Sequence, residues 1–386
     1  MPVVDGLRFL AILMVVLFHA DAYLAVKSRE LVFSQNSEWL TPLQSPFTYM
    51  GQGVKLFFVI SGFILAVPFM RYYFGLSDRK PVLKAYFMRR LTRIEPPYII
   101  STVVIFLIIV FITGSKYSLS TLVVSLGSSL LYIHTLVFVG KTPYINDVTW
   151  SLEIEVQYYI LAPFIMWGIC AVKDKHIRRA FTLALIGVFA FVGWLTNVYW
   201  QIDAHFITSL LQYFFSGILL CDVFLLDRER LEKLDRPWIF VLGLILLVPI
   251  AGIDHATSPY LALRMLSPVM ILAFYLIVFG NRWWRSIFSL NGLTLIGGMC
   301  YSIYLLHYVA IPAVGRLTIP GLPISNVFVY YFIQTFIFIF VILVVSSVYF
   351  LLIEKPCMRQ DWHIKVYEKI KNFALPGDKI ELKNTI

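Results

Sequence analysis

The sequence has few charged side chains for its length. Of its 386 residues, only 14% are charged and 59% are hydrophobic, whereas about a quarter of the residues in a soluble domain carry a charge. Apolar runs long enough to cross a bilayer recur from end to end, as in membrane proteins with several spans. This pattern excludes a soluble enzyme, a nucleic-acid-binding protein and a disordered chain.

Cysteine is also rare. The four cysteines show neither a CxxC pair nor the Cys/His spacing of a metal site, so we expect no disulfide and no bound metal. Internal repeats and low-complexity segments are lacking as well, which excludes solenoid proteins. The formal net charge is +10, and the basic residues lie in short loops between apolar runs, where they act as topology signals rather than as a nucleic-acid surface.

The apolar runs predict an all-α, polytopic membrane bundle of about ten transmembrane helices. An eleventh apolar stretch, 119–139, contains small residues and His134, which favours a re-entrant or interfacial helix packed against protein. The ten predicted spans are 7–26, 53–71, 97–114, 154–172, 179–198, 206–225, 237–253, 261–280, 294–315 and 325–353.

Charge predicts the orientation of these spans. Basic residues crowd the loops at 71–93 and 173–179, and both loops should be cytoplasmic. An even number of crossings must therefore separate them, so 119–139 should not cross. With ten spans and both termini in the cytoplasm, only five of the 32 Lys and Arg residues lie on the outer side. A bacterial inner (plasma) membrane is the expected location.

The chain divides into a membrane domain, 1–353, and a polar, basic cytoplasmic tail, 354–386. The first apolar run, preceded by Arg8, can also be interpreted as a signal peptide. Because Asp5 lies in the same short segment and many further spans follow, an uncleaved first helix is the simpler interpretation.

Ionisable residues within spans are costly and therefore mark candidate functional sites. Arg8 and His19 are eleven residues apart in the first span, so they share one helix face and lie roughly 16 Å apart along the axis. Asp5 precedes Arg8 by three residues and can pair with it. Arg8 can also be a simple topology anchor and His19 a packing residue, but histidine is the side chain best suited to accept a proton near neutral pH.

Three arginines precede the third span. Arg93 lies four residues after Arg89 and three after Arg90, so the three share one side of a helical turn. Clustered guanidinium groups suit phosphate because each presents a fixed fork of donors. The alternatives are a topology signal or a contact with anionic lipid.

Two later spans carry further candidates. Trp150, Ser151 and Glu155 open the fourth span; Trp150 suits the membrane interface, whereas Glu155 lies deeper and can orient a histidine, bind a hydroxylated substrate or pair with a base. In the ninth span, Tyr304 and His307 share one face. The pair Ser61-Gly62 in the second span permits close helix contact.

Together these segments resemble the acyltransferase 3 family of integral membrane acyltransferases. The resemblance runs in order from position 7 to about 356 and rests on six pieces. They are Arg8 and His19 with ten residues between them, GVxLFFVISGF at 53–63, RRLxRIxPxY at 89–98, WSLxxExQxY at 150–159, YSIYLLH at 301–307 and IEKP at 353–356. Two positions depart from the family pattern: Phe9 replaces a usual glycine, and Lys55 replaces a usual acid and alters the charge near the outer mouth.

The resemblance implies transfer of an acetyl or other short acyl group from acyl-CoA, as co-substrate, to a hydroxyl of a glycan or lipid-linked sugar. On that basis we expect the nucleotide end of acyl-CoA at Arg89, Arg90 and Arg93, the pantetheine arm beside Arg8, and His19 as general base. Further roles follow from the same resemblance: Glu155 orients the imidazole, and the acceptor side is contacted by Ser151, Trp150, Tyr304 and His307.

Two other classes share a bundle of ten spans with intramembrane charges. A transporter of a polar or anionic small molecule is the main alternative, although the sequence shows no repeated half and no matched pair of broken helices. A scaffold or flippase partner without chemistry is the other. The acceptor, the acyl chain length and the oligomeric state do not follow from the residues.

Overall fold

The computed structural model describes residues 1–31, 47, 50–200, 205–252, 261–320 and 326–358. These residues are helical, and no strand occurs among them. The predicted all-α class is therefore confirmed. Of the predicted tail 354–386, residues 359–386 lie outside the described part of the chain.

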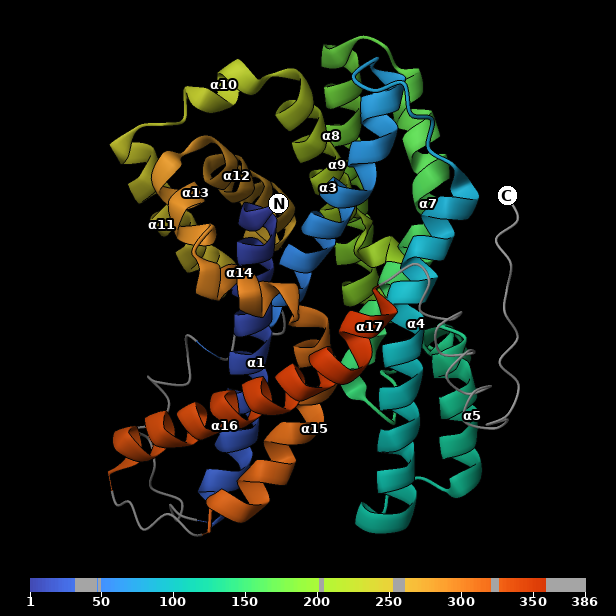
Figure 1. Ribbon diagram of the computed structural model, residues 1–386, viewed down its shortest axis with the longest axis vertical. Coiled ribbons are helices and arrows are strands. Elements are labelled where there is room, and N and C mark those ends of the chain that lie inside the picture. The colour runs from blue at the N-terminus through green and yellow to red at the C-terminus, as the bar shows by residue number, and fades with distance from the viewer. Residues whose placement is uncertain (32–46, 48–49, 201–204, 253–260, 321–325, 359–386) are drawn as a thin grey trace, which may run out of the picture.

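Every predicted apolar run contains a helix (Figure 1). The longer helices are α1 (Pro2–Leu31), α3 (Gly53–Tyr73), α4 (Leu83–Ile108), α5 (Leu119–Leu130), α7 (Trp150–Ala171), α8 (Lys175–Trp200), α9 (Leu211–Leu226), α11 (Pro237–Gly252), α12 (Leu261–Gly280), α15 (Cys300–Thr318) and α16 (Val327–Tyr349). The shorter ones are η2 (Met50–Gln52), the π-helix η3 (Ile109–Thr113), α6 (His134–Val137), η4 (Asp147–Thr149), η5 (Ile207–Ser209), α10 (Arg228–Glu232), α13 (Arg282–Phe288), α14 (Asn291–Gly298), the π-helix η6 (Phe350–Glu354) and α17 (Lys355–Cys357).

Among the described residues, six helices are long and apolar enough to cross a membrane, or up to eight when two bent pairs each count as one span. The predicted number of about ten is thus not confirmed. The predicted spans at 206–225 and 237–253 correspond to α9 and α11, which have 16 residues each. Such helices are about 24 Å long, less than the roughly 30 Å of a bilayer core.

The stretch predicted not to cross, 119–139, forms α5 and α6. With 12 residues, α5 is only about 18 Å long, so it is too short to cross. It lies beside the half of α4 that is remote from the connection between α3 and α4 (Figure 1). This placement agrees with a re-entrant or interfacial helix packed against protein.

Close contact between α3 and α9 organises the centre of the bundle. A Cβ atom at Gly62 would lie 2.2 Å from the carbonyl oxygen of Phe214, and one at Gly217 would lie 2.1 Å from that of Val59. Both glycines are therefore required for the backbones to approach this closely. The predicted role of the Ser61-Gly62 pair in helix contact is confirmed.

Aromatic side chains fill the core around this crossing. The ring of Phe214 on α9 packs against Phe58 of α3 at a centroid distance of 4.9 Å and stacks on Tyr158 of α7 at 3.9 Å. The hydroxyl of Tyr275, on α12, donates a hydrogen bond to the carbonyl of Leu56 at 3.1 Å. These contacts join α3, α7, α9 and α12 into one packed unit.

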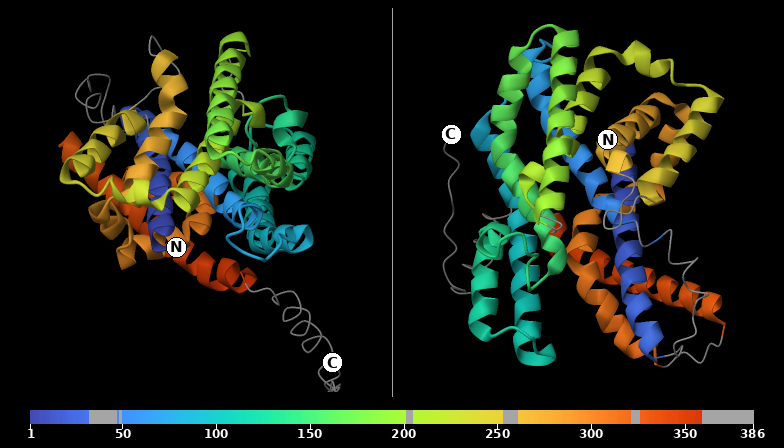
Figure 2. Two further views of the ribbon diagram at one scale, coloured as in Figure 1. Left: turned by 90° about the horizontal axis from the view of Figure 1, so that it is seen from above. Right: turned by 180° about the vertical axis from the view of Figure 1, so that it is seen from behind.

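The first helix lies against the later part of the chain. Helix α1 contacts α14 and α15, and α16 lies across α1 and α15 (Figures 1 and 2). At Gly297 a Cβ atom would lie 1.8 Å from the carbonyl oxygen of Asp5, so α14 touches the first turns of α1 directly. This packing brings residues near positions 8 and 19 beside residues near position 300.

Candidate active site

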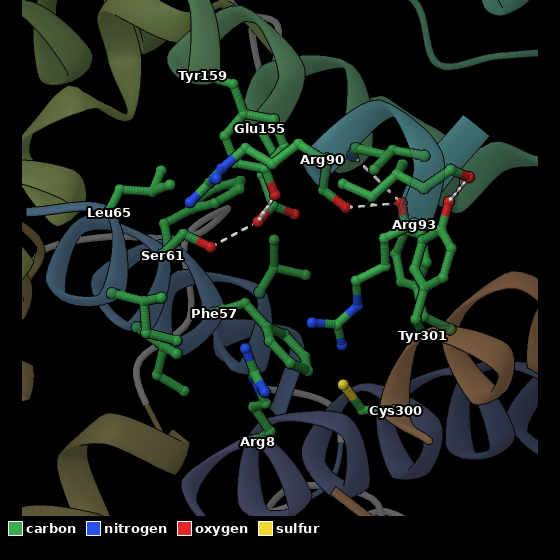
Figure 3. Close-up of a pocket in the computed structure, with 18 of the residues that line it drawn as sticks. Arg8, Phe57, Ser61, Leu65, Arg90, Arg93, Glu155, Tyr159, Cys300 and Tyr301 are labelled. Carbon is green, nitrogen blue, oxygen red and sulfur yellow. Dashed lines mark hydrogen bonds between the residues drawn. The ribbon is translucent and has the colours of Figure 1, made fainter. Parts of the chain in front are cut away.

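A cavity of about 410 Å³ lies where α1, α3, α4, α7 and α15 meet, and we call it the arginine cavity (Figure 3). Its volume is in the range of small-molecule sites. The predicted residues in its wall are Arg8, Arg89, Arg90, Arg93, Ser151, Glu155 and Tyr304. Residues from five separate segments of the sequence are thus brought together, as the prediction requires.

The charge of this wall is strongly positive. Among the described residues of the wall, four guanidinium groups face a single carboxylate, that of Glu155. Arg90 is held in place: its guanidinium lies over the ring of Tyr86 at 4.1 Å, and one of its nitrogens donates to the carbonyl of Tyr86 at 3.2 Å. Arg8 pairs with Asp5 at 2.9 Å, which confirms the predicted ion pair within α1.

Glu155 has partners other than the predicted histidine. Its carboxylate oxygen Oε1 accepts hydrogen bonds from Ser61 Oγ at 2.5 Å and from Tyr159 Oη at 2.6 Å, and both side chains line the arginine cavity. Within the described residues, no hydrogen bond joins Glu155 to His19. The predicted orienting role of Glu155 therefore has no supporting contact among the described residues, because the face of α7 that carries Glu155 turns toward Ser61 of α3 and the arginines.

The ring of His19 lies among aromatic and imidazole rings. Its centroid is 5.2 Å from that of His307, 5.2 Å from Tyr308 and 4.9 Å from Phe18. His19 is not part of the cavity wall, but Val15, one turn earlier on α1, is. The imidazole therefore lies one helical turn beyond the arginine cavity.

The partner ring of His307 has a defined orientation. Its Nδ1 atom lies 3.0 Å from the carbonyl oxygen of Ile303 and 2.9 Å from that of Tyr304. Because carbonyl oxygens only accept hydrogen bonds, Nδ1 carries the proton and Nε2 has a free lone pair. The side chain is fully buried, and Nε2 has no hydrogen-bond partner within the described residues.

Helix α15 connects this histidine pair to two cavities. Tyr304 lines the arginine cavity, and Tyr308 lines a second cavity of about 500 Å³. The hydroxyl of Tyr304 donates to the carbonyl of Val148 at 2.7 Å and also bonds Ser151 Oγ at 2.9 Å. Tyr304 and Tyr308 lie one turn apart on α15, with His307 between them in the sequence. One turn of this helix thus separates the two cavities.

The remaining predicted residue, Trp150, lies outside both cavity walls. Its ring packs on His205 at a centroid distance of 4.1 Å, and His205 lines the second cavity. The sequence interpretation missed Ser61, Tyr159 and Tyr308. Tyr308 directly follows the YSIYLLH segment and Tyr159 ends WSLxxExQxY, so a helix-face projection of those two segments was the signal available.

Within the part of the chain that the structure describes, no cluster of three or more His, Cys, Asp or Glu side chains has the geometry of a metal site. The four cysteines are free thiols, and all are buried.

Comparison with known proteins decides the family. A family model described as an acyltransferase domain matches residues 2–353. The chain belongs to the acyltransferase 3 family. The predicted resemblance is thereby confirmed over nearly the whole sequence, and the matching segments supply most of the wall of the arginine cavity.

Several curated proteins are similar to this family member. Two, from Staphylococcus aureus strains MSSA476 and MRSA252, are named as candidate O-acetyltransferases; each is 26% identical over 350 residues, covering 83% of this chain and 52% of the relative. O-acetyltransferase OatA of strain NCTC 8325 is 24% identical over 349 residues, with the same coverage. The chain thus spans about half the length of these relatives. No solved structure shows significant similarity to the chain.

Proposed function

We propose that this chain is a membrane-embedded O-acyltransferase. It moves an acetyl or other short acyl group from acyl-CoA to a hydroxyl of a carbohydrate acceptor. The observation that carries this proposal is the arginine cavity, whose wall ends at the turn of α15 that packs against His19. Family membership and the names of the similar proteins support the same reaction class.

In the proposed orientation, the protein lies in the plasma membrane and its basic connections face the cytoplasm. The connection between α3 and α4 and that between α7 and α8 lie at one end of the bundle, whereas α4 meets α5 at the opposite end (Figure 1). Arg89 and Arg90 lie in the first two turns of α4, close to the basic end. A donor made in the cytoplasm can therefore reach the arginine cavity directly.

Acyl-CoA fits this cavity by charge. Its phosphates are polyanionic, and guanidinium forks bind phosphate oxygens in bidentate fashion. Arg89 is exposed at the cavity wall, whereas Arg90 is held by Tyr86. We assign the phosphates to these two residues and to Arg93, and the thioester to the region between Arg8 and Val15.

His19 is the proposed general base. The acceptor oxygen attacks the thioester carbonyl while its proton passes to the imidazole. The carbon–sulfur bond then breaks, and the coenzyme A thiolate leaves and takes up that proton. General-base catalysis contributes about 10²–10⁴-fold to rate, and holding donor and acceptor together supplies further acceleration.

His307, rather than Glu155, is the proposed partner of His19. Its Nδ1–H is anchored on two backbone carbonyls, and its Nε2 lone pair faces no other described polar group. That lone pair can accept an N–H from the neighbouring imidazole of His19 and so select its tautomer, as carboxylates do in hydrolytic triads. The earlier assignment of His307 to the acceptor is thereby replaced by a positioning role.

The test is acceptor-dependent release of the coenzyme A thiol. Wild-type protein and a His19→Ala variant are purified in nanodiscs and mixed with acetyl-CoA and a carbohydrate acceptor. We expect turnover to fall at least about 100-fold in the variant while its thermal unfolding and elution volume stay unchanged. A folded His19→Ala protein with wild-type turnover contradicts the assignment of the base.

A transporter is the competing class, and one structural feature favours it. Two apolar helix pairs are bent, α12 with α13 by 94° and α14 with α15 by 70°. Broken helices occur in transporters, but there they occupy matching positions in two related halves, whereas both pairs here lie between residues 265 and 318. Anion flux into sealed vesicles without any thiol release would support transport.

A further inference from the structure

The second cavity lies on the other side of His307 from the arginine cavity, and we call it the outer cavity. Its volume is about 500 Å³, within the range of small-molecule sites. Its wall comes from the connection between α4 and α5, from the segment that leads into α7, from α15 and from His205, two residues before η5. The side chains that matter here are Lys116, Tyr117, Lys141, Tyr144, Asp147 and Tyr308.

An ordered aromatic surface forms part of this wall. The rings of Tyr117 and Tyr144 stack with centroids 4.1 Å apart and 14° between their planes. Tyr144 is braced in turn by Phe138 at 4.9 Å and by His134 at 5.1 Å. A rigid aromatic face beside hydroxyl groups suits an amphipathic ring, with apolar C–H groups on one face and hydroxyls on its edge.

The polar groups of the wall suit a sugar that also carries an acid. Asp147 accepts a hydrogen bond from the hydroxyl of Thr142, so its carboxylate is an acceptor that can also bind sugar hydroxyls. Among the described residues of the wall, Lys116 and Lys141 are both exposed, and Asp147 is the one carboxylate. The wall therefore has an excess of positive charge, which favours an anionic ligand.

The outer cavity also lies close to the proposed chemistry. Tyr308 lines the cavity, and its ring meets the ring of His19 edge-on at 5.2 Å. A single side chain therefore separates a ligand in this cavity from the imidazole.

We propose that the outer cavity binds the acyl acceptor and that this acceptor is an acidic carbohydrate. The inference rests on the proposed acyl transfer, because it names the second substrate of that reaction. The aromatic face of Tyr117 and Tyr144 holds the sugar ring, Asp147 accepts from its hydroxyls, and Lys116 with Lys141 pairs with its acid group.

The test is calorimetric titration of the full-length protein in nanodiscs with two probes of equal length, tetragalacturonate and maltotetraose. Coenzyme A is present in excess, so that the arginine cavity is occupied and cannot bind the acidic probe. We expect tetragalacturonate to bind more tightly than maltotetraose, and this preference to shrink at high salt. Equal affinity for the two probes, or no binding of tetragalacturonate, overturns the proposal.

Variants locate the binding. Lys116→Gln combined with Lys141→Gln should weaken tetragalacturonate binding about tenfold, since each exposed charge pair contributes up to about 1 kcal/mol. Lys80→Gln, at the opposite end of the bundle, is the matched control and should leave binding unchanged. Equal losses in both, or a loss in neither, overturn the assignment of the site.

A third variant, Tyr144→Phe, keeps the stacked ring and should retain binding, whereas Tyr144→Ala should lose it. If both retain full affinity, the aromatic face is not part of the site. Because titration needs no turnover, its result is independent of thiol release: absence of thiol release with a bound acidic probe rejects the acyl transfer, not the cavity.

Discussion

At the scale of single residues, the site depends on which group each ionisable side chain meets. Tyr159 lies between two of them: its hydroxyl donates to Glu155, and its ring lies 5.6 Å from the guanidinium of Arg90. Glu155 and Arg90 are thus positioned by a shared aromatic residue. Glu155 therefore contacts residues of the arginine cavity, where we propose that the donor binds.

The phosphate role of Arg90 predicts a specific kinetic change. In Arg90→Gln, the KM for acetyl-CoA should rise about tenfold, because one charge-assisted contact contributes roughly 1.5 kcal/mol, and kcat should change little. Steady-state thiol release at varied acetyl-CoA measures both. Arg79→Gln is the control, since Arg79 is an exposed arginine in the connection before α4 that does not line the cavity. Identical saturation curves for the two variants would show that Arg90 acts only as a topology signal.

The proposed positioning role of His307 predicts a change in kcat rather than in the KM for acetyl-CoA. In His307→Leu, kcat should fall roughly 10–100-fold with the acetyl-CoA KM unchanged, because the donor contacts remain while the tautomer of His19 is lost. His307→Gln should retain more activity than His307→Leu, since its amide oxygen can accept the N–H from His19. Equal kcat values in the two variants would show that His307 only packs.

At the scale of elements, two glycine crossings allow the helices to carry these residues to one place. The backbone of α3 lies against that of α9 at Gly62 and Gly217, and the adjacent Ser61 then reaches Glu155 on α7. The small residue at position 62 therefore sets the distance between α3 and α9. At that distance the hydroxyl of the neighbouring Ser61 reaches Glu155. The bend before α15 has a related effect, because it points His307 and Tyr308 at α1.

Substitution of one crossing glycine tests this arrangement. Gly217→Ala places a Cβ atom 2.1 Å from the carbonyl oxygen of Val59, so α3 and α9 must separate, at a cost of about 1–3 kcal/mol. We expect a lower thermal unfolding temperature in nanodiscs. Gly168→Ala and Gly187→Ala are matched controls on α7 and α8, where nothing lies within 4 Å; these should be neutral or slightly stabilising. Equal behaviour of all three would show that the crossing tolerates a methyl group.

At the scale of the whole molecule, a network of ion pairs lies at the basic end of the bundle. At the basic end, Arg179 bonds both Asp222 and Asp227, Arg178 bonds Asp222 at 2.6 Å, and Lys175 bonds Asp227 at 2.9 Å. This network joins α8 to α9 and to the start of α10. It holds the helix ends together next to the connection where the chain carries much of its positive charge.

The network predicts a pH dependence of stability. Hydrogen bonds from Arg179 and then Lys175 lower the pKa of Asp227 to about 2, below the value of about 3.9 for an unperturbed aspartate. A depressed pKa in the folded state stabilises the fold above pH 4, and this contribution is lost as the pH falls from about 4 toward 2.

Thermal unfolding in nanodiscs between pH 6 and pH 3 checks this. The wild-type unfolding temperature should fall with pH below 4, and Asp227→Asn should start lower at pH 6 and fall less. Asp78→Asn, in the connection between α3 and α4, serves as the control, because it should keep the wild-type slope. If Asp227→Asn also keeps that slope, other carboxylates carry the effect.

The sequence by itself determined the class of this protein, its helical runs, its family and most of the wall of the arginine cavity. Hydropathy and helical spacing are local properties, so Arg89, Arg90 and Arg93 could be placed on one face of a turn without any knowledge of their neighbours. The number of spans was less certain, because short helices such as α9 and α11 have apolar composition without the length to cross a bilayer.

Only the tertiary structure decided which groups meet. Glu155 lies with Ser61 and Tyr159, not with His19, and the imidazole meets His307 and Tyr308 from a helix that begins nearly 300 residues later. These pairings depend on crossings between helices distant in the chain, which are set by close packing at glycines and by bends in the helices. Local patterns do not encode such contacts, because the same helix face can pack against several neighbours.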